Sequence, residues 1–210
     1  MASVQDICNT ALSHIGSDAI ISSISPPDGS VEAGHCARFY PLARQTMIEM
    51  IQPSFARTRV ALAEVTNDST VWAYAYARPS ACIKPLRILT LGAGVTVFTQ
   101  DEVVLNADEA SSATFDIEAD VIYTNEPEAV LVYLRDVTDS SKFTPMMVIG
   151  MSYLLASFLA GPIVKGDSGA SAGQKLYKLA EVWLTTAATS NANSSHTVQG
   201  NQVPALLSRR

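Results

Sequence analysis

Charged residues are scarce in this sequence. They make up 16% of the 210 residues, below the roughly 25% of an average soluble domain, whereas hydrophobic residues make up 48%. The 14 Lys and Arg are outnumbered by 20 Asp and Glu, and the longest basic stretches are Arg57-Thr58-Arg59 and Arg209-Arg210. Because proteins that grip nucleic acid need clustered Lys and Arg, tight sequence-independent DNA binding is not expected, although DNA could slide past an acidic wall.

Cysteine is also rare, and its pattern excludes several kinds of site. Cys8, Cys36 and Cys82 form no C-x-x-C pair, so we expect reduced, buried thiols in a cytosolic setting. No spacing among the cysteines, His14 and His35 matches a zinc motif. Walker and dinucleotide-binding motifs are absent too. The sequence therefore predicts neither a metal nor a cofactor.

Signals for export or membrane insertion are weak. The chain does not open with a basic stretch and an apolar run, so we expect no signal peptide. Residues 143–164 carry no charge and are long enough to span a bilayer. The run nevertheless contains Gly161-Pro162 near its end and several hydroxyl groups, which favours the central helix of a soluble bundle. We therefore expect no membrane partner.

Two capping patterns predict helices in the first 54 residues. Ser3-Val4-Gln5-Asp6 resembles a capping box, and Gly16 suits the end of that helix. Ser30 is expected to cap a second helix that ends at Gln52-Pro53. Pro41 lies inside the second helical pattern and predicts a kink or a break there.

From residue 55 to residue 142 the apolar period changes to two, which is typical of strands. Trp72, Tyr74 and Tyr76 alternate with alanine and share one face of an extended segment. We expect this aromatic face to lie in the core or in a subunit interface. A hairpin and three further strands are predicted at residues 95–105, 114–118, 120–124 and 129–137.

Helical signals return at Thr144, a capping residue followed by proline in the favoured first position. That helix is expected to stop at Gly161-Pro162, before a Gly/Ser-rich loop over residues 166–173. Ser171 should cap a last helix. One face of this helix is formed by Leu176, Leu179, Ala180, Trp183 and Ala187.

These patterns predict an α+β fold with a helical bundle, an inserted small antiparallel β subdomain and an extended C-terminal tail. Residues 1–54 and 143–193 would form the bundle, and residues 55–142 the β subdomain. Residues 194–210 lack periodicity and are expected to form an extended arm. The arm contains a short apolar and basic cluster suited to docking on a partner, comprising Val203, Pro204, Leu206, Leu207, Arg209 and Arg210.

Two serine motifs raise the alternative of a hydrolase. Gly166-Asp167-Ser168-Gly169 resembles the nucleophile segment of chymotrypsin-like proteases, and residues 169–173 match G-x-S-x-G around Ser171. Both lie beside helical signals, and neither has a suitable base nearby in the sequence. A helix cap is the expected role of Ser171, but a serine hydrolase using Ser168 or Ser171 stays an alternative.

Several short motifs, taken in order over about residues 4–193, resemble the tail tubular protein A family of short-tailed bacteriophages. The chain departs from the family at Ser54, where relatives often carry a tryptophan, so an anchoring aromatic at that junction is in doubt. The motifs are Asp6-Ile7-Cys8-Asn9-Thr10-Ala11-Leu12, Phe39-Tyr40-Pro41-Leu42-Ala43-Arg44, Phe55-Ala56-Arg57-Thr58-Arg59-Val60-Ala61-Leu62, Trp72-Ala73-Tyr74-Ala75-Tyr76 and Asp136-Val137-Thr138-Asp139.

The resemblance implies a structural protein of the virion without catalytic residues. Members form a twelve-subunit ring that joins the portal protein to the tail nozzle protein and extends the channel for double-stranded DNA. Such a protein would be assembled in the bacterial cytoplasm and act at the head–tail junction. The expected interface residues are Arg57, Arg59, Trp72, Tyr74, Tyr76 and Arg135, and the C-terminal arm would dock on the portal. A neck completion protein of another phage type is a further alternative.

Overall fold

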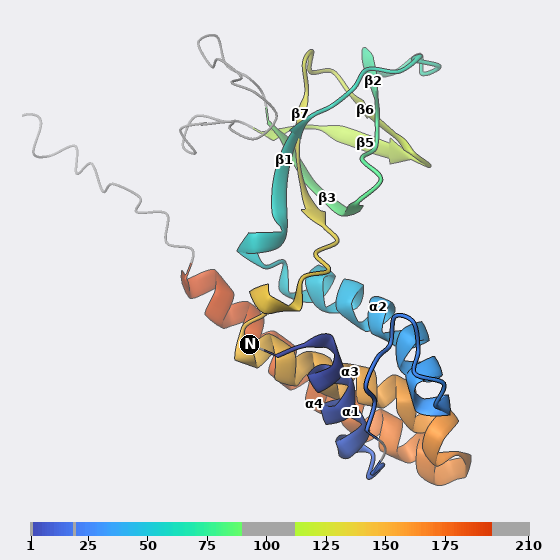
Figure 1. The fold of residues 1–210 in the computed structure, drawn as a ribbon. Helices are drawn as coiled ribbons and strands as arrows, with labels where there is room; N and C mark the ends of the chain where they lie inside the picture. Colours follow the sequence, from blue (N-terminus) through green and yellow to red (C-terminus); the bar gives the residue numbers. More distant parts are fainter. Residues whose placement is uncertain (1, 19, 90–111, 195–210) are drawn as a thin grey trace, which may run out of the picture.

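The computed structural model describes residues 2–18, 20–89 and 112–194, which form a helical part and a β part (Figure 1). The fold is α+β, as predicted. All the described strands lie between the second and third α-helices in the chain. The helices are α1 (Val4–His14), α2 (Val31–Ile51), α3 (Pro145–Val164) and α4 (Gly166–Ser194). The strands are β1 (Arg57–Ala61), β2 (Tyr74–Ala77), β3 (Cys82–Leu89), β4 (Ser112–Ala113), β5 (Phe115–Glu118), β6 (Val121–Thr124) and β7 (Val130–Arg135).

The first two helices begin where their capping residues predict. Ser3 and Asp6 form both hydrogen bonds of a capping box, and the Ser30 hydroxyl accepts from Ala33 N–H. The predicted break at Pro41 is wrong, because α2 runs through this residue without interruption. Tyr40 and Ala43 are buried on either side of Pro41. This burial offsets the missing backbone hydrogen bond.

The expectation for the last two helices is corrected at several points. α3 continues through Gly161 and Pro162 to Val164, and Lys165, with φ of 63°, makes the turn into α4. Residues 166–173 are therefore helical rather than a loop, and Ser171 lies inside α4 instead of capping it. α4 extends to Ser194, the first residue of the expected arm. Residues 195–210, and thus nearly all of the predicted arm, lie outside the described residues.

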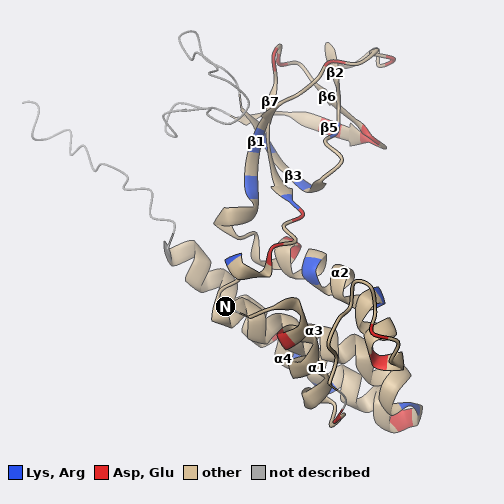
Figure 2. Cartoon of the chain, in the orientation of Figure 1, with Lys and Arg blue, Asp and Glu red and all other residues tan. Residues whose placement is uncertain are grey.

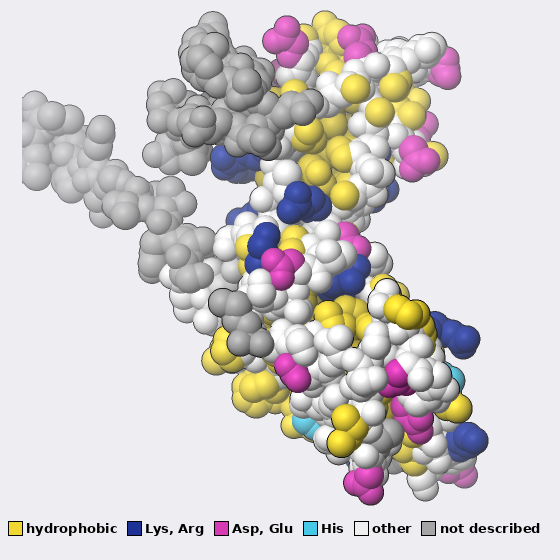
Figure 3. Space-filling model, viewed as in Figure 1, with side chains coloured by type: hydrophobic (Ala, Val, Ile, Leu, Met, Phe, Trp, Pro, Cys, Tyr) yellow, Lys and Arg dark blue, Asp and Glu magenta, His cyan; other side chains and the backbone are white. Residues whose placement is uncertain are grey.

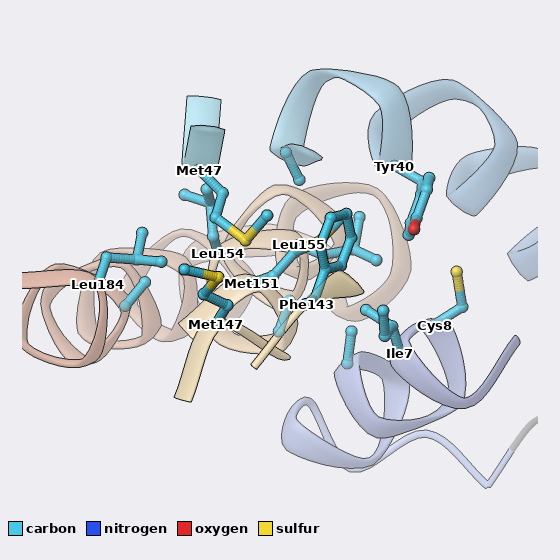
Figure 4. Close-up of a cluster of buried hydrophobic side chains, with 14 of the residues drawn as sticks. Ile7, Cys8, Tyr40, Met47, Phe143, Met147, Met151, Leu154, Leu155 and Leu184 are labelled. Carbon is cyan, nitrogen blue, oxygen red and sulfur yellow. The ribbon is translucent and has the colours of Figure 1, made fainter. Parts of the chain in front are cut away.

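α3 is the central helix of the helical part and packs against α1, α2 and α4. Met147, Met151, Leu154 and Leu155 of α3 are buried and meet side chains of the other helices (Figure 4). By length and composition α3 could cross a membrane, and half of its most apolar stretch is buried inside the protein. The apolar residues on several faces of α3 are thus explained by packing, because neighbouring helices cover these faces.

The β part consists of two small antiparallel sheets, ordered β1-β7-β3-β4 and β2-β6-β5. Tyr76, Ile88, Ile122 and Leu131 belong to a second hydrophobic core between them. The strands expected at 114–118, 120–124 and 129–137 correspond to β5, β6 and β7. The predicted hairpin over residues 95–105 lies outside the described residues.

The two parts are joined by two short connections and by specific contacts between them. The Arg44 guanidinium on α2 donates two hydrogen bonds to the Asp136 carboxylate just after β7, at 2.9 and 2.8 Å. Phe55 and Phe143, one in each connection, pack with ring centroids 6.0 Å apart. An aromatic pair is thus present at this junction, next to Ser54.

Candidate assembly surfaces

The serine motifs lie on α4, and no base among the described residues is hydrogen-bonded to either serine. Ser168 and Ser171 are exposed on α4, and neither side chain has a hydrogen-bond partner within the described residues. Gly169 and Gly173, which give the G-x-S-x-G match, face α3 instead. A Cβ atom at Gly169 would lie 2.7 Å from the Ala160 carbonyl oxygen, and one at Gly173 would lie 3.1 Å from the Ser157 carbonyl oxygen. The motif is therefore a close helix–helix contact.

A serine and a histidine do meet elsewhere in the protein, at a site the sequence did not single out. His14 Nε2 lies 3.1 Å from Ser152 Oγ, and its ring stacks on Tyr153 at 4.0 Å between centroids. The Ser152 hydroxyl donates to the Ile149 carbonyl, so it accepts from His14 rather than losing its proton to it. Burial lowers the pKa of His14. Ser152 is fully buried, and within the described residues no carboxylate is hydrogen-bonded to the His14 ring, so this pair joins α1 to α3.

The thiols are buried, as the sequence predicts, and all three cysteines are free. A hydrogen bond with Cys36, together with burial, raises the pKa of Cys8, whereas the same bond lowers the pKa of Cys36. Burial raises the pKa of Cys82. Cys82 borders a cleft of about 520 Å³ between the two parts, next to Gln45 and Asp136. Both Asp136 oxygens already accept from Arg44, and one also accepts from Gln45, so this carboxylate is not available as a base.

Basic side chains gather on the β part close to the helices (Figure 2). Arg57 and Arg59, both predicted at an interface, are exposed on β1. The register places Arg59 opposite Val132 of β7, and Val132 opposite Arg87 of β3. In the same way Arg57, Leu134 and Lys84 form the neighbouring row. Residues directly opposite in an antiparallel sheet share a face, so four cations form a basic face around β7.

Sequence reasoning missed Lys84 and Arg87, which join the basic face only through strand pairing. They lie more than 20 positions after Arg59 in the chain, and no local motif links them. The predicted interface residue Arg135 is exposed at the end of β7, where alternation places it on the face opposite to the basic face. Among the described residues, Lys84 has an ion pair with Glu49 at 3.8 Å, and none of the basic-face arginines has one.

Acidic side chains gather on the opposite side of the β part and at its outer loops (Figures 2 and 3). Asp116, Glu118 and Asp120 lie exposed on β5 and in the turn to β6, and we refer to these three residues as the acidic hairpin. Further carboxylates on the outer loops are Glu64, Asp68, Glu126 and Glu128. None of these seven forms an ion pair within the described part of the chain. The charges are therefore few but strongly segregated.

The three aromatics that the sequence placed on one interface differ in burial. Tyr76 is 2% exposed and its hydroxyl donates to the Glu126 carbonyl, so it belongs to the β core. Tyr74 stacks on Tyr76 and is half-buried. Trp72 lies just before β2, not within a strand, and is also half-buried. Tyr74 and Trp72 thus keep surface that another chain could cover.

The outer face of α4 is more apolar than the helical part requires. Leu179 is 46% exposed and Val182 is 64% exposed. On another side of α4, a groove of about 510 Å³ runs along α3 between Phe158 and Tyr177. Leu179 was expected on one helix face with Leu176, Ala180 and Ala187, which are buried, whereas Leu179 is exposed. Exposed apolar surface of this kind is typical of proteins that assemble.

The described residues hold no group of three His, Cys, Asp or Glu side chains that could bind a metal ion. Comparison with models of known protein families and with curated proteins finds no match to this chain.

Proposed function

We propose that this chain is a head–tail adaptor of a short-tailed bacteriophage, a structural protein rather than an enzyme. In this role it forms a homo-oligomeric ring, with twelve subunits implied by the family resemblance, between the portal protein and the tail nozzle protein. Double-stranded DNA passes through the ring without sequence-specific contacts. The arm at residues 194–210 docks on the portal.

The observation that carries the proposal is the arrangement of the two parts. The motifs resembling tail tubular protein A imply a helical bundle with an inserted β subdomain, and the described strands of this chain lie between α2 and α3. The resemblance lies in short motifs of this sequence, and two of these motifs contact each other in the structure. Arg44 and Asp136, which belong to two of them, form the ion pair that joins the helical part to the β part.

The surface also suits assembly better than turnover. The basic face and the acidic hairpin are separate and lack partners of opposite charge on the described chain, apart from Lys84. A ring built head to tail needs two different, complementary surfaces on each subunit. In contrast, the candidate nucleophiles Ser168 and Ser171 have no neighbouring base within the described residues.

Replacement of Ser168 or Ser171 by alanine should leave assembly intact and should not lower the melting temperature. Both residues are exposed inside α4, where alanine is a better helix former than serine by up to about 0.5 kcal/mol. Thermal denaturation and native mass spectrometry check both expectations. A covalent adduct of a serine-reactive phosphonate at either position would favour the hydrolase alternative instead.

Mixing the chain with the portal protein of the same virion should give a ring of defined mass attached to the portal. Native mass spectrometry of the chain alone and of the mixture measures this, and electron microscopy then locates the ring. A chain that stays monomeric with the portal present would refute the adaptor function. A ring located in the neck of a long-tailed particle would replace it by the completion-protein alternative.

A further inference from the structure

Two edge strands of the β part carry opposite charges. β1 is an edge strand of the four-stranded sheet and presents Arg57 and Arg59, whereas β5 is an edge strand of the three-stranded sheet and presents Asp116 and Glu118. The two edges lie on opposite sides of the β part (Figures 1 and 2). Exposed edges invite pairing with another chain, and charge is a common means of controlling which chain binds.

The arginines of the basic face, Arg57 and Arg59 on β1 and Arg87 on β3, repel one another within one chain. Arg59 and Arg87 flank Val132 on the same face, so their Cα atoms are about 10 Å apart across two strand spacings. Arg57 and Arg59 follow each other on one strand at a separation of about 7 Å. Within the described residues none of these three arginines has a carboxylate in ion-pair distance. A partner that brings negative charge would relieve this repulsion.

The acidic hairpin has a matching spacing. Asp116 and Glu118 are two residues apart on β5 and share a face, as Arg57 and Arg59 do on β1. One Asp116 oxygen accepts from Ile117 N–H at 2.8 Å. No hydrogen bond within the described residues involves the Glu118 or Asp120 carboxylate.

We propose that the β1 edge of one copy binds the acidic hairpin of the next copy, with Arg57 and Arg59 facing Asp116, Glu118 and Asp120. This rests on the proposed function, because it names the surfaces through which the ring closes. The contact is heterologous, and its two surfaces lie on opposite sides of the same part, as a closed ring requires. A second copy is favoured over nucleic acid because the same chain supplies the complementary carboxylates.

Two charge-reversed proteins test the pairing. The first carries Arg57→Glu and Arg59→Glu, and the second carries Glu118→Arg and Asp120→Arg. Alone, each should lose assembly, with the apparent dissociation constant raised roughly a hundredfold if each of two reversed pairs costs about tenfold. Mixed in equal amounts, they should assemble again in alternation, because every interface then holds opposite charges. A chain with all four changes should also assemble by itself.

The control carries Arg38→Glu and Lys175→Glu at exposed sites of the helical part. These changes alter the net charge by the same amount as those of the first protein. It should assemble like the unaltered chain, and circular dichroism should show that all variants are folded. Normal assembly of the first protein, or no recovery in the mixture, would overturn the pairing while the ring itself stands. If the first protein assembles but loses salt-dependent DNA retention, the basic edge serves nucleic acid instead. A monomeric unaltered chain, with portal present, would refute the proposed function itself.

Discussion

Replacement of Gly169 by alanine should destabilise the protein, whereas the same replacement at Gly161 should stabilise it. A Cβ atom at Gly169 would lie 2.7 Å from the Ala160 carbonyl oxygen, so α3 and α4 would have to move apart. Overpacking of this kind costs about 1–3 kcal/mol and outweighs the gain of up to about 1 kcal/mol in helix propensity. At Gly161 no described atom beyond the chain neighbours and the helix's own backbone lies within 4 Å of the added methyl group, so the propensity gain stands alone.

The pair forms a matched control because both glycines lie in the same helical hairpin and only the neighbouring atoms differ. Leucine at the two positions should widen the difference. Urea denaturation of the four variants measures the difference in the free energy of unfolding. In thermal denaturation, the melting temperature of a chain of this size should shift by about 2–4 °C per kcal/mol. Equal stability of the two alanine variants would mean that α3 and α4 do not cross closely at Gly169.

This crossing also marks where sequence reasoning failed. Gly166, Gly169 and Gly173 predict a loop by their composition, and residues 169–173 match a catalytic motif. What decides their conformation is a contact with Ala160 and Ser157 of α3, earlier in the chain, and this contact forms only when the two helices pack antiparallel. The turn at Lys165 adds to the difficulty, since a lysine with positive φ follows no local rule.

Local signals, in contrast, predicted much of the fold. The caps at Ser3, Ser30 and Thr144 depend on a hydroxyl and a backbone N–H three residues away, so they are visible in the sequence itself. The basic face is the opposite case. Arg59 and Arg87 come together only because β7 pairs with both β1 and β3, with irregular register in β3. Strand pairing between distant segments could not be derived from the positions of these residues in the chain.

Replacement of Asp136 by alanine should cost about 3 kcal/mol and loosen the β part from the helical part. The side chain of Arg44 is 10% exposed and that of Asp136 is 22% exposed. Removal of one partner from a buried pair leaves the other charge uncompensated, which typically costs 3–5 kcal/mol, and the partial exposure of Asp136 places the cost at the lower end. Chemical denaturation measures the loss, and proteolysis in the connection at residues 138–142 should become faster.

A double variant separates the lost pair from lost packing. Arg44→Met with Asp136→Leu removes both charges and keeps similar volumes, so it should recover most of the stability that Asp136→Ala loses. If the double variant is as unstable as the single one, the pair is not the cause of the loss.

The dependence of stability on pH gives the last test of this ion pair. Burial alone would raise the pKa of Asp136, but the hydrogen bonds from Arg44 and Gln45 and the charge of Arg44 outweigh it and hold the pKa below its usual value. A carboxyl with a lowered pKa contributes its full stability above its unfolded value near 3.8 and loses it as the pH falls through the folded value. Asp136→Asn should therefore cost stability at neutral pH and flatten the decline of stability below pH 4.

Asp139→Asn is the control. Hydrogen bonds from Ser141 lower the pKa of Asp139 as well, but within the described residues no ion pair joins Asp139 to the helical part. If both variants keep the connection equally resistant to proteolysis at pH 7, Arg44 and Asp136 do not join the two parts.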